Sequence, residues 1–220
     1  PDGHNQQINA MTPEAVGPRQ FWQWRGAPPL PCYRFKVHFA HKTVVVADPW
    51  ARAVCRKKSV GDPAWSVALV NPPQFDWQGH DGVHLAPEDA VILELHVGDQ
   101  SAHDSAMAGQ PASWDALVAA DGPGGLRHAL RLGVNAVELM PVTSWPVDEG
   151  EGLNHWGYMP GFFCAVSGRY AAGYGDAPPG SWPEFSGGAF ADPGEGLKRV
   201  VRACHGAGVA VILDLVYNHV

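Results

Sequence analysis

The chain has few cysteines, no long apolar run and no extended basic cluster, and each shortage excludes a class of protein. The longest basic run is Arg56-Lys57-Lys58 and the formal net charge is −7, so neither nucleic acid nor an anionic membrane is an expected partner. No stretch approaches the roughly 20 apolar residues that cross a bilayer. The 4 cysteines lie far apart without a C-x-x-C pair, so reduced thiols are expected rather than a metal knuckle or redox motif: Cys32, Cys55, Cys164 and Cys204.

The first third of the chain also lacks helical periodicity. Residues 1–30 are rich in Pro, Gly, Asn and Gln and are predicted to be poorly ordered, and residues 1–20 lack the basic and apolar regions of a secretory signal. Residues 31–70 contain short alternating runs, at 33–39 and 42–46, which predict the remnant of a β-sandwich. Residues 71–90, with Pro72-Pro73 and Gly79, read as a linker into a different architecture.

From residue 91 to 220 apolar strands alternate with helical patterns. Strands are predicted at 91–97, 135–140 and 209–216, and helices at 114–132, with an interruption at 122–125, and at 193–207. This order defines a βαβαβ unit and therefore a parallel sheet with right-handed crossovers. We predict the α/β class.

Two α/β architectures begin in this way, the eight-stranded barrel and the open doubly wound sheet. No G-x-G-x-x-G motif follows any strand, whereas the connection from 141 to 191 is very long. Long strand-to-helix loops are typical of barrels, whose sites lie at the carboxyl ends of the strands. We therefore expect the first three strands of a (β/α)8 TIM barrel, with the chain ending after the third.

The last predicted strand contains one carboxylate in an otherwise apolar run. Asp214 interrupts the run from 209 to 216, which is typical of a strand covered on both faces, and Tyr217, Asn218 and His219 follow it. An unpaired buried carboxylate costs several kcal/mol, so Asp214 must have hydrogen-bonding partners. These residues form a candidate site at the strand's carboxyl end; the alternative is a structural Asp that fixes the loop.

A second cluster lies inside the long loop, where residues 154–163 are rich in aromatic side chains. Aromatic rings stack on sugar rings and their polar tips reach hydroxyl groups, so the loop suits a carbohydrate. Tyr158 is the better candidate for ligand contact, whereas Trp156 could equally pack against the barrel rim. On the first strand Glu94 and His96 occupy alternate positions and point the same way, which favours a structural pair, and Glu138 on the second strand is a carboxylate without an evident partner.

Several blocks, in order along the chain, resemble the isoamylase-type glycogen/starch debranching enzymes of glycoside hydrolase family 13, the α-amylase superfamily. The D-x-x-Y-N-H ending is shared across that superfamily, whereas the first two blocks point to the isoamylase branch. The blocks are Ala47–Val54, Phe75–Gly79, Glu88–Val97, Leu132–Val142, Trp156–Tyr158 with Arg169–Ala171, and Val211–His219.

The resemblance implies hydrolysis of α-1,6 branch linkages by a retaining mechanism. His219 would hydrogen-bond the glucose at the cleavage point, Tyr158 would stack on it, and Asp214 and Asn218 would hold the architecture of the site. Retaining glycosidases need two carboxyl groups about 5 to 5.5 Å apart. In this family they lie on later strands, so no catalytic residue is expected within these 220 residues and the chain would be an inactive amino-terminal fragment.

The sequence also departs from the family pattern. Leu93 stands where a Tyr is usual, Gly98-Asp99 follow Val97 where Arg-Gly-Phe is usual, and 143–152 lacks the calcium-binding pattern. No cofactor or metal is therefore expected. The departures leave open the alternative of a non-catalytic, isoamylase-like glucan-binding or regulatory subunit.

The same resemblance sets expectations for partners and compartment. The partner would be a branched α-glucan such as starch, glycogen or amylopectin, and the protein could assemble as a homo-oligomer or with other isoamylase-like subunits. The plastid stroma is the expected location, with the cytoplasm as the alternative.

Overall fold

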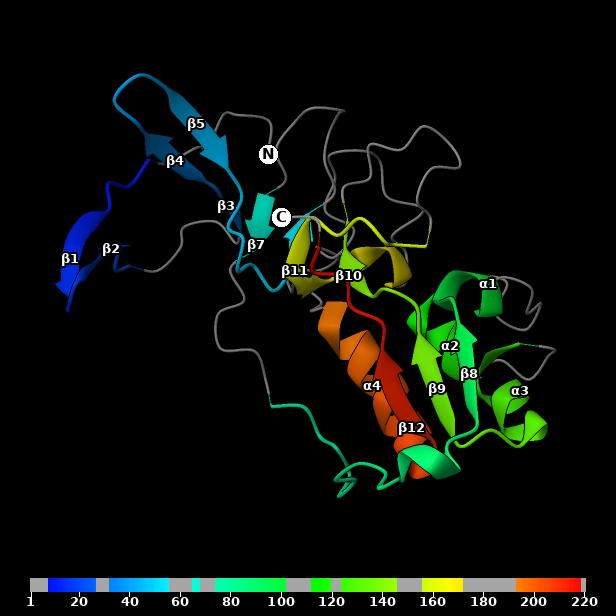
Figure 1. Ribbon diagram of the computed structural model, residues 1–220. Coiled ribbons are helices and arrows are strands. Elements are labelled where there is room, and N and C mark those ends of the chain that lie inside the picture. Colours follow the sequence, from blue (N-terminus) through cyan, green and yellow to red (C-terminus); the bar gives the residue numbers. More distant parts are fainter. Residues whose placement is uncertain are drawn as a thin grey trace.

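The computed structural model describes residues 8–26, 32–55, 65–67, 74–101, 112–119, 124–145, 156–171 and 193–218. The described residues of its amino-terminal part form short strands, and the part after residue 86 is a mixed α/β unit (Figure 1). The predicted α/β class is thus confirmed for the larger, carboxyl-terminal part. No helix in the described ranges is long and apolar enough to cross a membrane.

Two hairpins lie in the amino-terminal part. Strands β1 (Thr12–Val16) and β2 (Arg19–Gln23) pair antiparallel within the segment that the sequence predicts to be poorly ordered. The missed signal is the two-residue turn, in which Gly17 takes the positive φ of 60° that such hairpin turns require. Strands β4 (Phe35–His38) and β5 (Thr43–Val46) form the hairpin that the alternating pattern predicts.

The carboxylate of Asp48 links a third small sheet to the turn that begins at Asp48. The sheet has the order β3-β7-β6, formed by β3 (Cys32–Tyr33), β6 (Val54–Cys55) and β7 (Trp65–Val67). The Tyr33 hydroxyl donates to Asp48 Oδ2 at 2.6 Å, and the other oxygen of Asp48 accepts the N–H of Trp50 at 2.8 Å. Burial and the neighbouring carboxylate raise the pKa of Tyr33 well above its usual range, so the hydroxyl remains a donor.

The segment predicted as a linker lies along helix α4 (Pro193–Gly206). Arg202 donates to the carbonyl of Asp76 at 2.8 Å, and its guanidinium lies 5.1 Å from the centre of the Phe75 ring. Phe75 in turn meets Trp77 edge to face at 4.8 Å. A cation over an aromatic ring contributes about 0.5–1 kcal/mol at an exposed site, so these contacts attach the segment to the α/β unit.

The α/β unit contains one parallel sheet of order β12-β9-β8, built from β8 (Ile92–Leu95), β9 (Ala136–Leu139) and β12 (Ala210–Leu213). Leu95, Leu139 and Leu213 lie side by side in register at the carboxyl ends. The three predicted strands are therefore found where the sequence places them, although each is shorter. Two small strands, β10 (Thr143–Ser144) and β11 (Phe162–Val166), form a separate antiparallel pair.

The first strand ends earlier than predicted. A 3-10 turn, η1 (Pro87–Asp89), precedes β8, and a short helix, α1 (Val97–Ser101), begins where the strand was expected to continue. The Ser101 hydroxyl donates to the carbonyl of Val97 at 2.6 Å, and this bond stabilises α1. The predicted helix at 114–132 is two helices, α2 (Trp114–Ala119) and α3 (Gly125–Leu132), and a second 3-10 turn, η3 (Gly168–Tyr170), follows β11.

Helices α2 and α4 lie behind the sheet in Figure 1 and α3 lies beside β8, and all three contribute residues to the core. Leu95, Val137 and Leu139 are at most 5% exposed on the face of the sheet that belongs to this core. The expectation that the third strand is covered on both faces is wrong for the described residues, because Ile212, in register with Glu138 on the opposite face, is 37% exposed. Only one face carries helices in these ranges.

Two cysteines of the described part, Cys164 and Cys204, are free thiols. Cys204 is 2% exposed in the core, and burial raises the pKa of its thiol to about 12. A thiol in this state is a poor nucleophile, in agreement with a packing role.

Helix α4 packs against the core at Gly196, and a substitution at this position tests the packing. A Cβ at Gly196 would collide with the indole of Trp114, which is 1% exposed and cannot move aside. We expect Gly196→Ala to destabilise the protein by about 1–3 kcal/mol, although alanine alone would favour the helix by about 1 kcal/mol. Urea denaturation measures the difference.

The control is Gly206→Ala at the end of the same helix. Its Cβ would meet only the His80 ring, at 3.3 Å, and we expect no loss of stability. A Gly196→Ala protein as stable as the parent would show that α4 does not pack closely on Trp114.

Candidate functional site

The candidate site begins where β12 ends. The N–H of Asp214 donates to the carbonyl of Leu139 at 2.9 Å, which keeps the chain beside β9 for one more residue. The carboxylate then accepts a hydrogen bond from the Tyr158 hydroxyl, with 2.7 Å between Tyr158 Oη and Asp214 Oδ2. This contact supplies the partner that the sequence requires for Asp214, and it joins two segments that are 56 residues apart.

The carboxylates around Tyr158 keep its hydroxyl protonated. The hydrogen bond to Asp214 is the largest cause, followed by burial and by the charges of Asp214, Glu94 and Glu138, and together they raise the pKa of Tyr158 to about 12. The protonated hydroxyl can donate its hydrogen bond to Asp214, whereas a phenolate would carry a negative charge and repel the carboxylates. Tyr158 is therefore a hydrogen-bond donor to Asp214 at every physiological pH.

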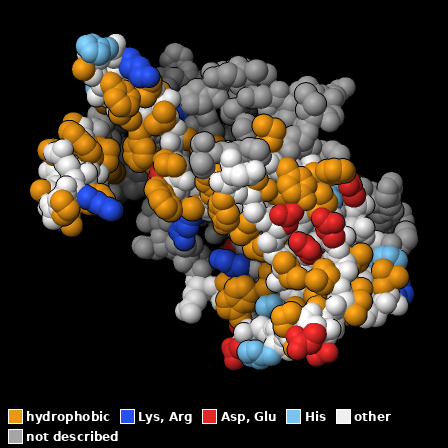
Figure 2. Space-filling model, viewed as in Figure 1, with side chains coloured by type: hydrophobic (Ala, Val, Ile, Leu, Met, Phe, Trp, Pro, Cys, Tyr) orange, Lys and Arg blue, Asp and Glu red, His pale blue; other side chains and the backbone are white. Residues whose placement is uncertain are grey.

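Glu94 and Glu138 lie next to each other in register on neighbouring parallel strands. Acidic side chains are visible together on the face of the sheet that carries no helices (Figure 2). Like charges in such positions repel, so this face is electronegative and suits a neutral polar ligand better than an anion. Within the described ranges no group of three or more His, Cys, Asp or Glu side chains could hold a metal ion.

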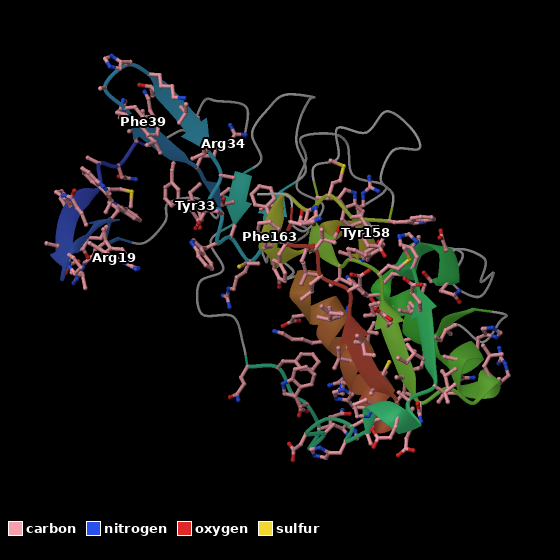
Figure 3. All side chains as sticks on the ribbon, in the orientation of Figure 1. Arg19, Tyr33, Arg34, Phe39, Tyr158 and Phe163 are labelled. Atoms are coloured by element: carbon pink, nitrogen blue, oxygen red, sulfur yellow. The ribbon has the colours of Figure 1, made fainter. Side chains whose placement is uncertain are left out.

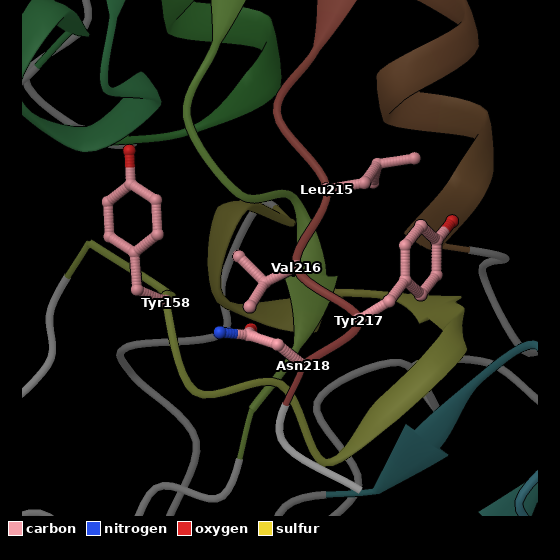
Figure 4. Close-up of a pocket in the computed structure, with 5 residues that line it drawn as sticks. All are labelled: Tyr158, Leu215, Val216, Tyr217 and Asn218. Atoms are coloured by element: carbon pink, nitrogen blue, oxygen red, sulfur yellow. The ribbon is translucent and has the colours of Figure 1, made fainter.

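Beside Tyr158 the chain after Asp214 forms the wall of an open cavity. The cavity has a volume of about 610 Å³ and is lined by Tyr158, Leu215, Val216, Tyr217 and Asn218. Figure 4 shows Val216 and Asn218 on the side of the segment that faces Tyr158, and Leu215 and Tyr217 on the other side. The volume falls within the range of about 300–1,000 Å³ typical of small-molecule sites.

Two further predicted residues, Tyr217 and Trp156, are largely exposed. Tyr217 is 60% exposed and its ring meets that of Phe163, with 5.6 Å between the ring centres. Trp156 is 50% exposed on the loop that carries Tyr158. His219 lies outside the described residues.

His96 is buried, whereas Glu94 is exposed, although the sequence predicts that both point the same way. Strand β8 ends at Leu95, so the alternation of strand side chains no longer applies to His96. Its Nε2 lies 2.9 Å from Tyr170 Oη, and its Nδ1 accepts the N–H of Asp99 at 3.2 Å. The sequence missed Tyr170, whose only signal was its place in the Arg169–Ala171 block.

The position of His96 also accounts for Gly98, which stands where the resemblance implies an Arg. A Cβ at Gly98 would lie 3.0 Å from Cε1 of the imidazole. A side chain here would require the ring to shift, so the departure from the family pattern fits the local packing of this chain.

Three curated relatives are similar to most of the chain. It is 32% identical over 189 residues to chloroplastic isoamylase SU1 of Zea mays, covering 80% of this chain and 22% of that protein. It is 30% identical over 210 residues to the glycogen operon protein GlgX homologue of Haemophilus influenzae, covering 85% and 29%. It is 32% identical over 182 residues to pullulanase of Bacillus subtilis, covering 79% and 23%. No family model matches the chain.

Solved structures give the same grouping. Pullulanase type I of Bacillus subtilis complexed with maltose superposes with a TM-score of 0.66 and 28% identity, over 92% of this chain and 28% of that one. A pullulanase mutant of Paenibacillus barengoltzii complexed with maltotriose gives 0.63 and 29%, over 86% and 29%. The catalytic module of a glycogen-degrading pneumococcal virulence factor, SpuA, shares the fold with a TM-score of 0.71 at 22% identity, over 94% and 31%.

These proteins are glycosidases of the debranching class. The chain is a homologue of isoamylases, glycogen debranching enzymes and pullulanases, and the resemblance predicted from the sequence is confirmed. It spans between a fifth and a third of the length of these curated relatives, at 22%, 29% and 23%.

Replacing Asp214 tests the electrostatics of the site. In Asp214→Asn the carboxylate charge and its strong hydrogen bond are lost, so we expect the pKa of Tyr158 to fall from about 12 toward 10.0. Ultraviolet titration of the phenolate, with Tyr158→Phe to assign the signal, measures this change. An unchanged titration would contradict the contact.

The same shift predicts a pH dependence of stability. The folded-state pKa of Tyr158 is raised above its ordinary 10.0, so its stabilising contribution is complete below pH 10 and is lost as the pH rises through about 12. Tyr158→Phe should remove this part of the alkaline loss.

Proposed function

We propose that the protein to which this chain belongs hydrolyses α-1,6 branch linkages of starch or glycogen with retention of configuration, and that this chain supplies part of its glucan-binding site. The observation that carries the proposal is the Tyr158–Asp214 contact at the carboxyl end of a parallel strand, beside an open cavity. Homology to isoamylases, debranching enzymes and pullulanases supports the reaction class.

Each residue of the site makes a different contact with one glucose unit. Tyr158 offers its ring face to the apolar face of the sugar, and Asp214 fixes the orientation of that ring through the hydroxyl. Asn218 faces Tyr158 across the cavity and offers amide groups to sugar hydroxyls (Figure 4). His219 would add a further donor next to it. The negative face formed with Glu94 and Glu138 disfavours anions and tolerates an uncharged sugar.

The architecture that we propose is a partial (β/α)8 barrel, with β8, β9 and β12 as its first three strands. Three parallel strands in order, with helices on one face and polar side chains at the carboxyl ends, support it. The strands between 31 and 70 would be the remnant of a carbohydrate-binding-like sandwich, followed by a linker over 71–90. We assign no catalytic carboxylate within this chain.

Partner and compartment follow from the same homology. A solved relative is complexed with maltotriose and another with maltose, which supports a branched α-glucan as the partner here. Relatives named as chloroplastic isoamylases support the plastid stroma, although bacterial proteins are equally similar. Assembly with other isoamylase-like subunits is part of the proposal.

Binding by this chain tests the site itself. We expect Tyr158→Ala to weaken maltohexaose binding about fivefold, because one stacked ring contributes about 1 kcal/mol. Isothermal titration calorimetry measures the affinity. The control is Trp50→Ala, which removes an aromatic side chain 78% exposed in the strand-rich part. If Trp50→Ala alone weakened binding, the sugar contact would lie elsewhere.

Hydrolysis by the natural full-length protein tests the reaction. Pullulan and amylopectin should release linear maltooligosaccharides, and proton NMR during the first turnovers should show the retained α-anomer. Binding of amylopectin without any hydrolysis would instead support the non-catalytic glucan-binding subunit.

A further inference from the structure

The loop that carries Tyr158 lies directly on a buried tryptophan. Gly157 has a φ of +85°, and a Cβ built on it would lie 2.9 Å from the carbonyl oxygen of Pro141 and 3.0 Å from Cζ3 of Trp145. Any side chain here would have to displace the backbone that presents Tyr158. Gly157 is therefore the point at which the orientation of Tyr158 is coupled to the position of Trp145.

Trp145 is held in a stack of buried aromatic rings. Its own exposure is 3%, and the ring of Tyr170 lies 6.1 Å from it at an angle of 59°. The Arg169 guanidinium lies 5.1 Å from its centre, and Trp114 meets Tyr170 edge to face at 5.0 Å. We call Trp114, Trp145, Tyr170 and His96 the aromatic stack.

A hydrogen bond links the aromatic stack to the residue that follows β8. Tyr170 Oη lies 2.9 Å from Nε2 of His96, the first residue after β8. On its other side the imidazole meets Asp99, whose backbone N and carboxylate Oδ2 both lie 3.2 Å from Nδ1, so the ring is held from both nitrogens. His96 and Tyr170 are 9% and 4% exposed, so neither group has water as a ready substitute partner.

These contacts form one continuous path from the end of β8 to the candidate site, through His96, Tyr170, Trp145, Gly157 and Tyr158. Each member but the last is buried, and the path ends at the hydroxyl that meets Asp214 (Figure 3 labels Tyr158 above the strand ends). Tyr158 thus has two supports. Asp214 holds the hydroxyl, and the aromatic stack holds the backbone.

We propose that His96, Tyr170 and Trp145 are positioning residues that set the orientation of the Tyr158 ring for its ligand. That the ligand is an α-glucan rests on the proposed function. The hydrogen bond between Tyr158 and Asp214 reports the orientation directly, because it requires the hydroxyl to stay within reach of the carboxylate.

The first test compares two glycines with positive φ. In Gly157→Ala the new Cβ meets Pro141 and Trp145, so Tyr158 should tilt and its phenolate should titrate closer to 10.0 than to about 12. Gly133 has a φ of +77° and nothing within 4 Å, so Gly133→Ala carries the same backbone strain without the contact. We expect Gly133→Ala to leave the Tyr158 titration unchanged.

The second test removes the hydroxyl group of Tyr170, and it can replace the first test if Gly157→Ala does not fold. Tyr170→Phe keeps the ring packing and loses the bond to His96. We expect the Tyr158 titration to move toward its ordinary value and maltotriose affinity to fall about twofold, less than the loss expected for Tyr158→Ala, while the chain remains folded by circular dichroism. His96→Gln retains an amide that can either donate to or accept from the Tyr170 hydroxyl, and it should preserve both values.

The outcomes separate the two proposals. If Tyr170→Phe lowers stability but leaves both the Tyr158 titration and the maltotriose affinity unchanged, the stack is merely structural and the inference is overturned. If the titration moves as expected but no form of the protein binds maltotriose, the positioning role stands and the proposed function fails.

Discussion

The hydrogen bond between Tyr158 and Asp214 is the constraint on which the site depends. It joins the end of a parallel strand to a loop 56 residues earlier, at 2.7 Å. Without it Asp214 would be an unpaired carboxylate next to two more acids, Glu94 and Glu138, whose mutual repulsion is already unfavourable. One tyrosine hydroxyl therefore satisfies a charge and, in the same contact, fixes an aromatic ring beside the cavity.

Along β8 and β9, apolar side chains that pack against the helices alternate with acidic side chains on the opposite face. Residues such as Leu95 and Leu139 face the helices and form the core, whereas Glu94 and Glu138 lie on the opposite face in the same strands. Because strand side chains alternate, one short sheet provides both a dry layer and a polar one. The glycines act at the few points where two layers touch, at Gly196 against Trp114 and at Gly157 against Trp145.

Sequence patterns predicted the strands, and the need of Asp214 for a hydrogen-bonding partner, because both depend on local composition. An apolar run interrupted by one carboxylate marks a strand end with a polar site, and the structure supplies the expected partner. Patterns failed for His96, since the point where β8 turns into α1 decides its direction and alternation does not reveal that point. They also missed Trp145 and Tyr170, whose contacts join distant segments and leave no periodic signal.

The central claim is that the cavity beside Tyr158 and Asn218 receives one glucose unit of an α-glucan. The most direct measurement is a crystal structure of the natural protein soaked with maltotriose. The account predicts a sugar ring within about 4 Å of the Tyr158 ring, stacked on its face, with the Tyr158–Asp214 contact retained. A sugar seated only on the strands between 12 and 46, with the cavity empty, would contradict it.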